Sequence, residues 1–231
     1  MTSRNVFVTG GTGYIGRVLI PRLIGRGHRV QALVRRGSEQ RLPTGCEAVI
    51  GNALDALSFA DQVRPSDTFV QLVGVPHPSP AKAAEFRSID LASVRASVSA
   101  AAGAGVKHFV YVSVAQPSPV MKAYQAARAG GEQMIRDSGL DATILRPWYV
   151  LGPGHRWPYA LIPMYWVLER LPGTRETASR LGLVTLEEMV AALAQSIESP
   201  PDHIRVLEVP AIKSAASRSE TEFVAARSGS A

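Results

Sequence analysis

The sequence predicts an α/β protein built on a doubly wound parallel sheet. Three glycines spaced three apart, Gly10, Gly13 and Gly16, follow a short apolar strand and lead into a helix. Strand and helix patterns then alternate as far as Arg146, and the strands are nearly continuous apolar runs. Such runs are typical of parallel strands that helices cover on both faces. Together these observations favour the Rossmann fold, followed by a small C-terminal lobe.

The apolar pattern and the Gly and Pro breaks place each element along the chain. Strands are expected at Asn5–Thr9, Arg29–Val34, Glu47–Ile50, Thr68–Val73, His108–Val114, Ala142–Arg146 and Arg205–Val209. Helices are expected at Tyr14–Arg26, Ala81–Ala104, Met121–Asp137 and Thr185–Glu198. The helix that starts at Met121 ends at Ser138-Gly139, because glycine commonly terminates a helix.

The chain divides into three predicted segments. Residues 1–147 form the Rossmann domain. Residues 148–212 form a small C-terminal lobe packed on it, because about 65 residues interrupted by proline hold little core of their own. Residues 213–231 are rich in Ser, Ala and charge, which predicts a disordered tail.

The three glycines are typical of a turn that binds the pyrophosphate of a dinucleotide. Gly10 lets the chain turn sharply off the strand, Gly13 lets the backbone approach a phosphate, and Gly16 lets the helix pack closely on the sheet. The N–H groups at the helix start then hold the phosphates. The strand before the glycines and the amphipathic helix after them favour this interpretation over an ordinary glycine-rich turn.

Composition excludes several classes of protein. The chain has 231 residues, 46% apolar and 19% charged, which is typical of a globular protein in solution. Its net charge is +6, but the basic residues are scattered, which favours a phosphate-bearing small ligand over nucleic acid. The single cysteine, Cys46, and a start without an apolar leader predict a cytoplasmic location. No apolar stretch reaches the roughly 20 residues of a membrane span. The oligomeric state is not predicted.

The end of the second predicted strand indicates which dinucleotide binds. An acidic residue at this position holds the adenosine ribose hydroxyls of NAD, whereas arginine accommodates the 2′-phosphate of NADP. Here the strand ends in Arg35 and Arg36, and Glu39 comes only after Gly37 and Ser38. Two guanidiniums pair strongly with a phosphate dianion, so NADP(H) is favoured over NAD(H). The alternative is that both arginines are only a solvated strand end.

With the glycine turn, Arg35, the stretch 51–55 after the third strand and Leu72–Gly74 after the fourth, the chain resembles the short-chain dehydrogenase/reductase superfamily. It most resembles the atypical, NmrA-like or NAD(P)H-binding branch, over about residues 5–210. The resemblance implies further contacts with the cofactor. Those at the pyrophosphate are Thr12, Tyr14 and Ile15, the adenine contact is Asn52, the adenosine ribose contacts are Leu72, Val73 and Gly74, and those beside the nicotinamide are Pro147 and Trp148.

The same resemblance implies a reaction. The family uses a Tyr as general acid or base, a Lys four residues later and a Ser that orients the substrate oxygen; the matching residues here are Tyr124, Arg128 and Ser113. Positions i and i+4 share a helix face, so Tyr124 and Arg128 converge. Arginine keeps the charge that lowers the pKa of a tyrosine, but its planar fork cannot take the place of an ammonium. A working Tyr–Arg site and a mere packing face of the helix therefore both stay open.

Other chemistry finds little support. The histidines show no metal-ligand spacing and no Gly-x-Ser-x-Gly elbow exists, so neither a metal site nor nucleophilic hydrolysis is predicted. His77 follows the fourth strand, where it contacts substrate or is simply exposed. Aromatic residues gather after Pro147, either as a pocket wall for an apolar or ring-shaped substrate or as packing for the lobe. They are Trp148, Tyr149, Trp157, Tyr159, Tyr165 and Trp166.

These features favour an NADP(H)-dependent oxidoreductase that acts on a small carbonyl, alcohol or quinone-like substrate, with Tyr124 as proton donor. One alternative is a non-catalytic NAD(P)H-binding sensor or accessory protein, in which the cofactor sets a conformation that a partner protein reads. Another is an epimerase or dehydratase with tightly held cofactor. The choice between the enzyme and the sensor depends on Arg128, which stands where the family has a lysine.

Overall fold

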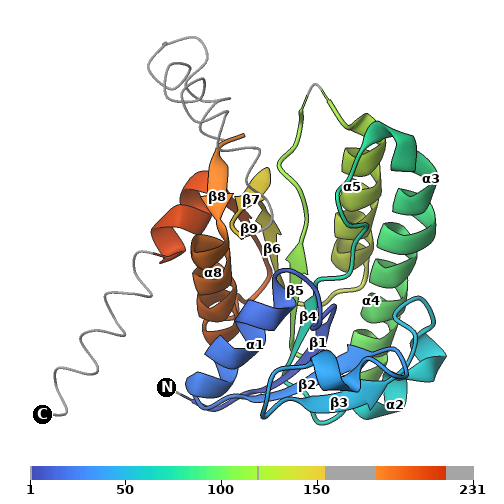
Figure 1. The fold of residues 1–231 in the computed structure, drawn as a ribbon, viewed down its shortest axis with the longest axis vertical. Helices are drawn as coiled ribbons and strands as arrows, with labels where there is room; N and C mark the ends of the chain where they lie inside the picture. Colours follow the sequence, from blue (N-terminus) through green and yellow to red (C-terminus); the bar gives the residue numbers. More distant parts are fainter. Residues whose placement is uncertain (1, 119, 154–180, 217–231) are drawn as a thin grey trace, which may run out of the picture.

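A seven-stranded parallel sheet forms the centre of the computed structural model, which describes residues 2–118, 120–153 and 181–216. The strand order is β3-β2-β1-β4-β5-β6-β9, and every neighbouring pair is parallel (Figure 1). The strands are β1 (Asn5–Thr9), β2 (Arg29–Val34), β3 (Glu47–Ile50), β4 (Thr68–Gln71), β5 (His108–Val112), β6 (Ala142–Arg146) and β9 (Ile204–Glu208). The order reverses between β1 and β4, which confirms the predicted doubly wound sheet.

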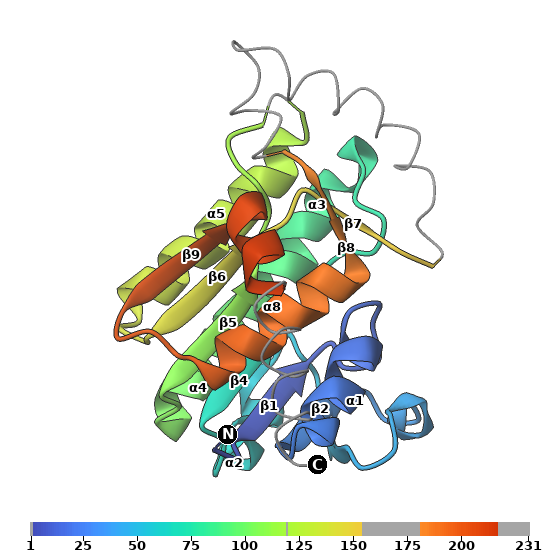
Figure 2. The ribbon, with the colours of Figure 1, turned by 90° about the vertical axis from the view of Figure 1, so that its left-hand side faces the viewer.

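Helices cover both faces of this sheet. The described α-helices between β1 and β9 are α1 (Gly16–Gly25), α2 (Ala60–Val63), α3 (Ala83–Glu85), α4 (Ala92–Ala104), α5 (Lys122–Asp137) and α8 (Leu186–Glu198). One face carries α1 and α8, which contact each other, and the opposite face carries α4 and α5 (Figures 1 and 2). A strand buried on both faces sends alternate side chains to two cores. In β1, Val6 and Val8 join the core under α1 and α8, whereas Phe7 joins the core under α4 and α5.

The helix predicted at Ala81–Ala104 is interrupted in the structure. A 3₁₀ turn (Pro80–Lys82) and the short α3 precede a π-helical turn (Phe86–Leu91), and α4 follows. Pro80 has no N–H to donate, which is consistent with a 3₁₀ start at this point. The predicted strands that were to end at Val73 and Val114 end earlier, at Gln71 and Val112. The backbone beyond them forms the loops of the candidate site, although the Leu72 N–H still donates to the Thr9 carbonyl at 3.1 Å and the Ser113 N–H to the Leu145 carbonyl at 2.7 Å.

The C-terminal segments belong largely to the main domain. β9 pairs with β6 as the last strand of the sheet, and α8 packs on the sheet beside α1. The domain boundary predicted at residue 147 therefore does not separate residues 183–212 from the Rossmann core. Among the residues that the structure describes, only β7 (Tyr149–Leu151) and β8 (Leu183–Thr185) form a separate two-stranded sheet.

The tail predicted to begin at residue 213 is helical at first. Residues 209–216 are helical, and Ala215 and Ala216 are buried. The predicted disorder is therefore wrong for residues 213–216, because Ala215 of this helix packs into the core under α1 and α8 and Ala216 is also buried. Residues 217–231 lie outside the described residues.

Candidate functional site

The glycine turn joins β1 to α1 at the carboxyl edge of the sheet. Gly10 has φ +78°, and a Cβ there would lie 2.9 Å from the carbonyl carbon of Leu72, at the end of the neighbouring β4. A Cβ on Gly16, where α1 begins, would lie 2.5 Å from the carbonyl oxygen of Gly10. The Gly13 N–H donates to that same oxygen at 3.0 Å. Side chains at Gly10 and Gly16 would therefore push the turn off the sheet, whereas Gly13 is exposed on its outer side.

The start of α1 suits an anion. In the described part of the chain, no side chain caps this helix and its first turn holds no acidic residue. The helix dipole and the N–H groups of the first turn both favour a negative charge there. Thr12, Tyr14 and Ile15 are half-buried around this point. A dinucleotide phosphate therefore fits the residues present.

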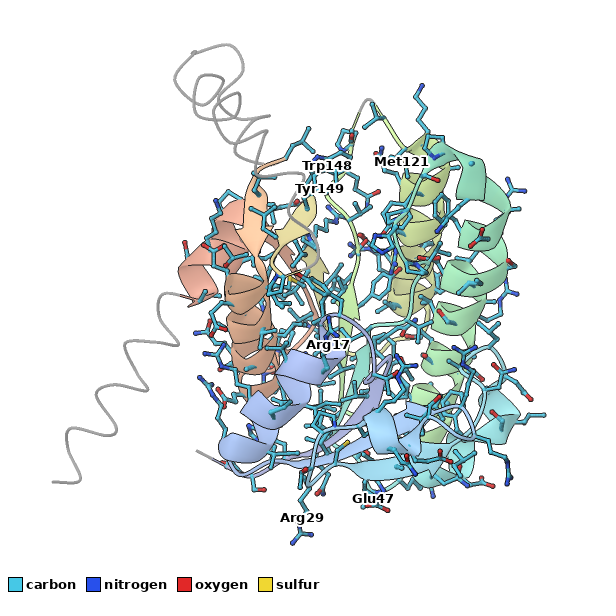
Figure 3. All side chains as sticks on the ribbon, in the orientation of Figure 1. Arg17, Arg29, Glu47, Met121, Trp148 and Tyr149 are labelled. Atoms are coloured by element: carbon cyan, nitrogen blue, oxygen red, sulfur yellow. The ribbon has the colours of Figure 1, made fainter. Side chains whose placement is uncertain are left out.

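Tyr14 connects the turn to the C-terminal part of the chain. Its ring lies 5.8 Å from the guanidinium carbon of Arg17, which Figure 3 shows on α1. A Cβ on Gly152, just after β7, would overlap the Tyr14 hydroxyl. The glycine turn and the β7 segment are thus in contact, although they are far apart in the sequence.

Arg35 and Arg36 directly follow β2, next to the glycine turn. The register pairs Thr9 of β1 with Leu33 of β2, so the chain leaves both strands at the same edge. Both arginines are exposed, and neither forms an ion pair with any described carboxylate. They are therefore available for an anionic ligand at the place where the sequence predicts the 2′-phosphate.

The other predicted cofactor contacts follow neighbouring strands. Asn52 lies exposed after β3, where its side-chain oxygen accepts from the Leu54 N–H at 3.1 Å. Leu72, Val73 and Gly74 follow β4, and Pro147 is buried after β6. Because all these strands are parallel, their carboxyl ends share one edge. Trp148 and Tyr149 lie at that edge too, opposite Arg29 and Glu47 at the strand starts (Figure 3).

A buried glutamine that the sequence did not single out holds the loop after β4. Gln71 accepts from the Thr9 hydroxyl at 2.6 Å and from the Val73 N–H at 2.8 Å, and its amide donates to Ser93 at 2.8 Å. The only signal in the sequence is a polar residue at the end of an apolar strand.

Arg128 lies inside the protein rather than at its surface. Its Nη2 contacts Asp90 Oδ1 at 2.6 Å, and its Nη1 donates to the Val112 carbonyl at 2.9 Å. The two charged side chains are 7% and 1% exposed. Burial opposes the charge on Arg128, but Tyr124, Tyr111 and Asp90 outweigh it and raise its pKa. The guanidinium is thus held in a buried ion pair.

Asp90 ties this ion pair to the nucleotide edge. It lies in the π-helical turn, and its Oδ2 accepts from the Val75 N–H at 3.1 Å, just beyond the β4 loop. A Cβ on Gly74 would overlap Arg128 Nη2, so the loop passes close over the guanidinium. Burial raises the pKa of Asp90, and Arg128 partly offsets that rise. The carboxylate was missed in the sequence, where its one signal is an acid between Ile89 and Leu91.

Tyr124 stands in the first turns of α5, beside this ion pair. The Arg128 guanidinium carbon lies 5.1 Å from the centre of its ring, and the Phe86 ring lies 5.0 Å away. The structure thus brings Tyr124 and Arg128 together as the i, i+4 spacing predicts. Phe86 and Asp90 come from the same π-helical turn. This one short segment therefore contacts both Tyr124, through Phe86, and Arg128, through Asp90.

Ser113 is engaged by a second buried carboxylate. Its hydroxyl donates to Glu132 at 2.6 Å, and Glu132 also accepts from Gln116 at 2.8 Å and from Arg146 Nε at 2.9 Å. Arg146 in turn donates to Glu208 of β9 at 2.8 Å. No pattern in the sequence assigns a chemical role to Glu132. The structure shows that it accepts the hydrogen bond of the Ser113 hydroxyl.

Several sequence-predicted groups are less informative. Trp148 and Tyr149 are half-buried, with ring centres 5.4 Å apart, whereas Trp157, Tyr159, Tyr165 and Trp166 lie outside the described residues. His77 is exposed in the loop after β4, with φ 48°.

Among the described residues there is no group of three His, Cys, Asp or Glu able to hold a metal ion. A search of the same residues finds no helix able to cross a membrane.

The parallel sheet, the glycine turn and the uncapped helix start define a dinucleotide-binding protein. Residues 10–157, more than half of the chain, match the NAD(P)H-binding family. The chain belongs to this family, which confirms the resemblance to the NAD(P)H-binding branch of the atypical short-chain dehydrogenases/reductases.

The chain is similar to several reductases. It is 29% identical over 198 residues to a ceramide reductase of Caulobacter vibrioides, covering 84% of this chain and 61% of the relative. It is 32% identical over 178 residues to a 3-diazoavenalumate denitrifying reductase of a Streptomyces species, covering 64% and 57%. A divinyl chlorophyllide a 8-vinyl-reductase of Zea mays is 29% identical over 160 residues, covering 62% and 39%. The matches thus span 39% to 61% of these relatives.

Solved structures show the same fold. A dTDP-glucose 4,6-dehydratase double mutant from Streptomyces venezuelae, solved with NAD, matches with a TM-score of 0.65 and 23% identity, covering 87% of this chain and 74% of that one. A short-chain dehydrogenase/reductase superfamily protein from Agrobacterium tumefaciens, also with NAD, matches with a TM-score of 0.62 and 15% identity, covering 97% and 99%. At these identities the likeness concerns the fold alone.

Proposed function

We propose that the protein is an NADP(H)-dependent reductase that acts on a small carbonyl or quinone-like compound. The observation that carries the cofactor preference is the exposed pair Arg35 and Arg36 at the end of β2, without a paired carboxylate among the described residues. The reductase activity is supported by the family match and by the reductases among the relatives.

In this proposal, each group of residues at the carboxyl edge of the sheet contacts a different part of the cofactor or the substrate. The N-terminus of α1 holds the pyrophosphate, and Arg35 and Arg36 hold the 2′-phosphate with charge-assisted hydrogen bonds. The loop at Leu72–Gly74 lines the adenosine ribose, and Pro147 flanks the nicotinamide. When bound, the reduced nicotinamide supplies a hydride to the substrate carbon. Tyr124 donates its phenolic proton to the substrate oxygen.

The cofactor preference is tested by thermal unfolding with NADPH or NADH. A ligand that binds only the folded state raises its stability by RT ln(1 + [L]/Kd), so we expect a larger rise in Tm with NADPH. Replacing both Arg35 and Arg36 by Ala should weaken NADPH binding by at least about tenfold, because each charge-assisted hydrogen bond contributes about 1.5–3 kcal/mol. NADH binding should change little.

Arg29→Ala is the matched control, because Arg29 is exposed at the opposite end of the same strand. It should leave the NADPH shift unchanged. Equal shifts with NADPH and NADH in the unaltered protein would contradict the 2′-phosphate assignment.

The activity is tested by following NADPH oxidation with a panel of small ketones, aldehydes and quinones. Tyr124→Phe should lower turnover on an active carbonyl substrate by about 10²–10⁴-fold, the usual contribution of a positioned proton donor. Gln133→Ala, at an exposed position further along the same helix α5, is the control and should retain turnover. Unchanged turnover in Tyr124→Phe would exclude Tyr124 as the donor.

One observation favours a second candidate, the NAD(P)H-binding sensor. Arg128 stands where the family has a lysine that contacts the ribose, yet its guanidinium is bound to Asp90 and to the Val112 carbonyl. Under this proposal NADPH raises Tm, but no compound of the panel oxidises it. The same two assays therefore separate sensor from reductase.

A further inference from the structure

The guanidinium of Arg128 lies between the loop after β4 and the end of β5. Its Nη1 donates to the Val112 carbonyl at 2.9 Å, and its Nη2 contacts Asp90 Oδ1 at 2.6 Å. Asp90 uses its other oxygen, Oδ2, to accept from the Val75 N–H at 3.1 Å. Both charged side chains are buried. The ion pair therefore joins α5 and the π-helical turn to the end of β5 and to the loop after β4.

Gln71 holds the same loop from its other end. Its Oε1 accepts from the Val73 N–H at 2.8 Å, and its Nε2 donates to the Ser93 hydroxyl at 2.8 Å. The Ser93 hydroxyl donates in turn to the Asp90 carbonyl at 2.9 Å. Gln71 and Ser93 are both buried. A continuous chain of buried hydrogen bonds thus connects the two side chains, Gln71 and Asp90, that accept from the N–H groups of the loop.

We propose that Asp90 and Arg128 are positioning residues that hold the loop at residues 72–75 in its cofactor-binding conformation. Arg128 then acts on the cofactor through this loop and is not a ligand of the nicotinamide ribose, the role of the lysine that the family has at this position. The cofactor part of this inference rests on the proposed function, which places Leu72–Gly74 at the adenosine ribose. The loop part does not, because the protein makes these contacts without a ligand.

Arginine suits this role better than lysine. The planar guanidinium directs its donors along fixed directions, so Nη1 and Nη2 engage two acceptors on different elements at once. A lysine ammonium is a compact charge on a flexible stem and fixes neither direction. The residue that departs from the family pattern is therefore the one whose shape can tie the loop after β4 to the end of β5.

Gly74 shows how closely the loop passes over the ion pair. A Cβ at Gly74 would overlap Arg128 Nη2 and would lie 3.1 Å from Asp90 Oδ1. The end of an exposed arginine side chain can move aside, but this guanidinium is buried and bound on two sides. Breaking such a pair is costly, because each charge is left uncompensated inside the protein. The path of the loop is thus set by the pair that it contacts.

The loop part is tested by amide hydrogen exchange in the full chain without cofactor. The double variant Asp90→Leu with Arg128→Met replaces the pair by apolar side chains of similar size, which is often neutral for stability. It leaves the Val75 N–H without its acceptor, so the amides of residues 73–75 should exchange at least about tenfold faster. Unchanged exchange of these amides overturns the proposal.

Glu198→Gln is the matched control for a loss of overall stability. Glu198 forms another ion pair of low exposure, with Arg26 at 2.8 Å, and its backbone carbonyl accepts from Arg4, which precedes β1. This pair lies at the amino ends of the strands, away from the loop. The control should leave exchange at residues 73–75 unchanged. An equal rise in the control would show that exchange there follows overall stability, which also overturns the proposal.

The cofactor part is tested by calorimetry with NADPH and with adenosine 2′,5′-bisphosphate, which has no nicotinamide ribose. A loosened loop must be ordered again on binding, so the double variant should bind both ligands at least about tenfold more weakly, and Glu198→Gln should bind both normally. Weaker binding of NADPH alone would make Arg128 a ligand of the nicotinamide ribose, and unchanged binding of both would remove its link to the cofactor. Either result overturns the proposal.

The same assays keep this inference separate from the proposed function. If the unaltered protein binds NADH and not NADPH, the proposed preference fails, and the comparison with NADH and ADP decides the role of the pair. If no compound of the substrate panel is turned over, the reductase proposal fails. The exchange and binding results then still stand, because neither needs a substrate.

Discussion

At the scale of single residues, Ser113 directly follows β5, at the position where the family resemblance implies a serine that orients the substrate oxygen. Its hydroxyl donates to Glu132 at 2.6 Å, and its oxygen therefore keeps lone pairs to accept a hydrogen bond but no proton to donate. Glu132 in turn binds Arg146 and Gln116. Ser113 is thus part of a buried polar network as well as a candidate for substrate contact.

This network should contribute strongly to stability. Glu132→Ala leaves Arg146 without its main counter-charge and Ser113 without its acceptor, so we expect a loss of about 3–5 kcal/mol in unfolding free energy, measured by urea denaturation. Glu187→Ala breaks the exposed pair with Arg22 and should lose at most about 1 kcal/mol. Similar losses in the two variants would show that the Glu132 network contributes no more than a surface ion pair.

At the scale of an element, the glycine turn packs closely on the start of α1, and this packing requires glycines, which have no side chain. A Cβ on Gly16 would lie 2.5 Å from the Gly10 carbonyl oxygen and 2.7 Å from the Gly11 Cα. These neighbours are backbone atoms, which cannot move without shifting the turn. The start of the helix is therefore positioned by close packing of backbone on backbone.

We expect Gly16→Ala to displace the turn and to weaken NADPH binding by at least about tenfold, measured by calorimetry. Gly103→Ala is the matched control, because a methyl group on this α4 glycine would meet open space and its φ is not positive. Alanine is the better helix former by about 1 kcal/mol, so the control should be as stable as the unaltered protein or more so. Normal binding in Gly16→Ala would contradict the assigned packing.

At the scale of the whole molecule, the stability of the fold should depend on pH through a histidine far from the nucleotide edge. His108 begins β5 and is buried, with its Nε2 3.0 Å from the Thr143 hydroxyl on β6. Burial, aided by the charges of Arg205 and Arg4, lowers its pKa from 6.5 to about 3. The folded protein therefore holds this imidazole neutral.

A lowered histidine pKa stabilises the fold at high pH. This contribution is complete above about pH 6.5 and is lost as the pH falls toward 3, at up to about 1.4 kcal/mol per pH unit. His108→Gln should flatten the fall in unfolding free energy between these values, measured by urea denaturation at a series of pH values. His203→Gln, at an exposed position, should keep the slope of the unaltered protein. If both variants behave alike, His108 is not the source.

Much of the fold and the conformation of the glycine turn could be predicted because they follow from local pattern. Apolar runs predict buried parallel strands, and the spacing of Gly10, Gly13 and Gly16 predicts the turn and helix that the structure confirms. The C-terminal elements were harder to place. Nothing local shows that β9 extends the main sheet, because that pairing joins residues about 60 positions apart.

The sequence by itself determined the parallel sheet, the glycine turn between β1 and α1 and the neighbouring positions of Tyr124 and Arg128, because each depends on a short period or spacing. Only the tertiary structure decided which groups accept the hydrogen bonds that Arg128 and Ser113 donate. Asp90 and Glu132 lie 38 and 19 residues away from their partners, and they meet them only because the helices and strands pack together. Burial then makes these contacts strong, since a charge inside the protein must be balanced by the groups that packing places beside it.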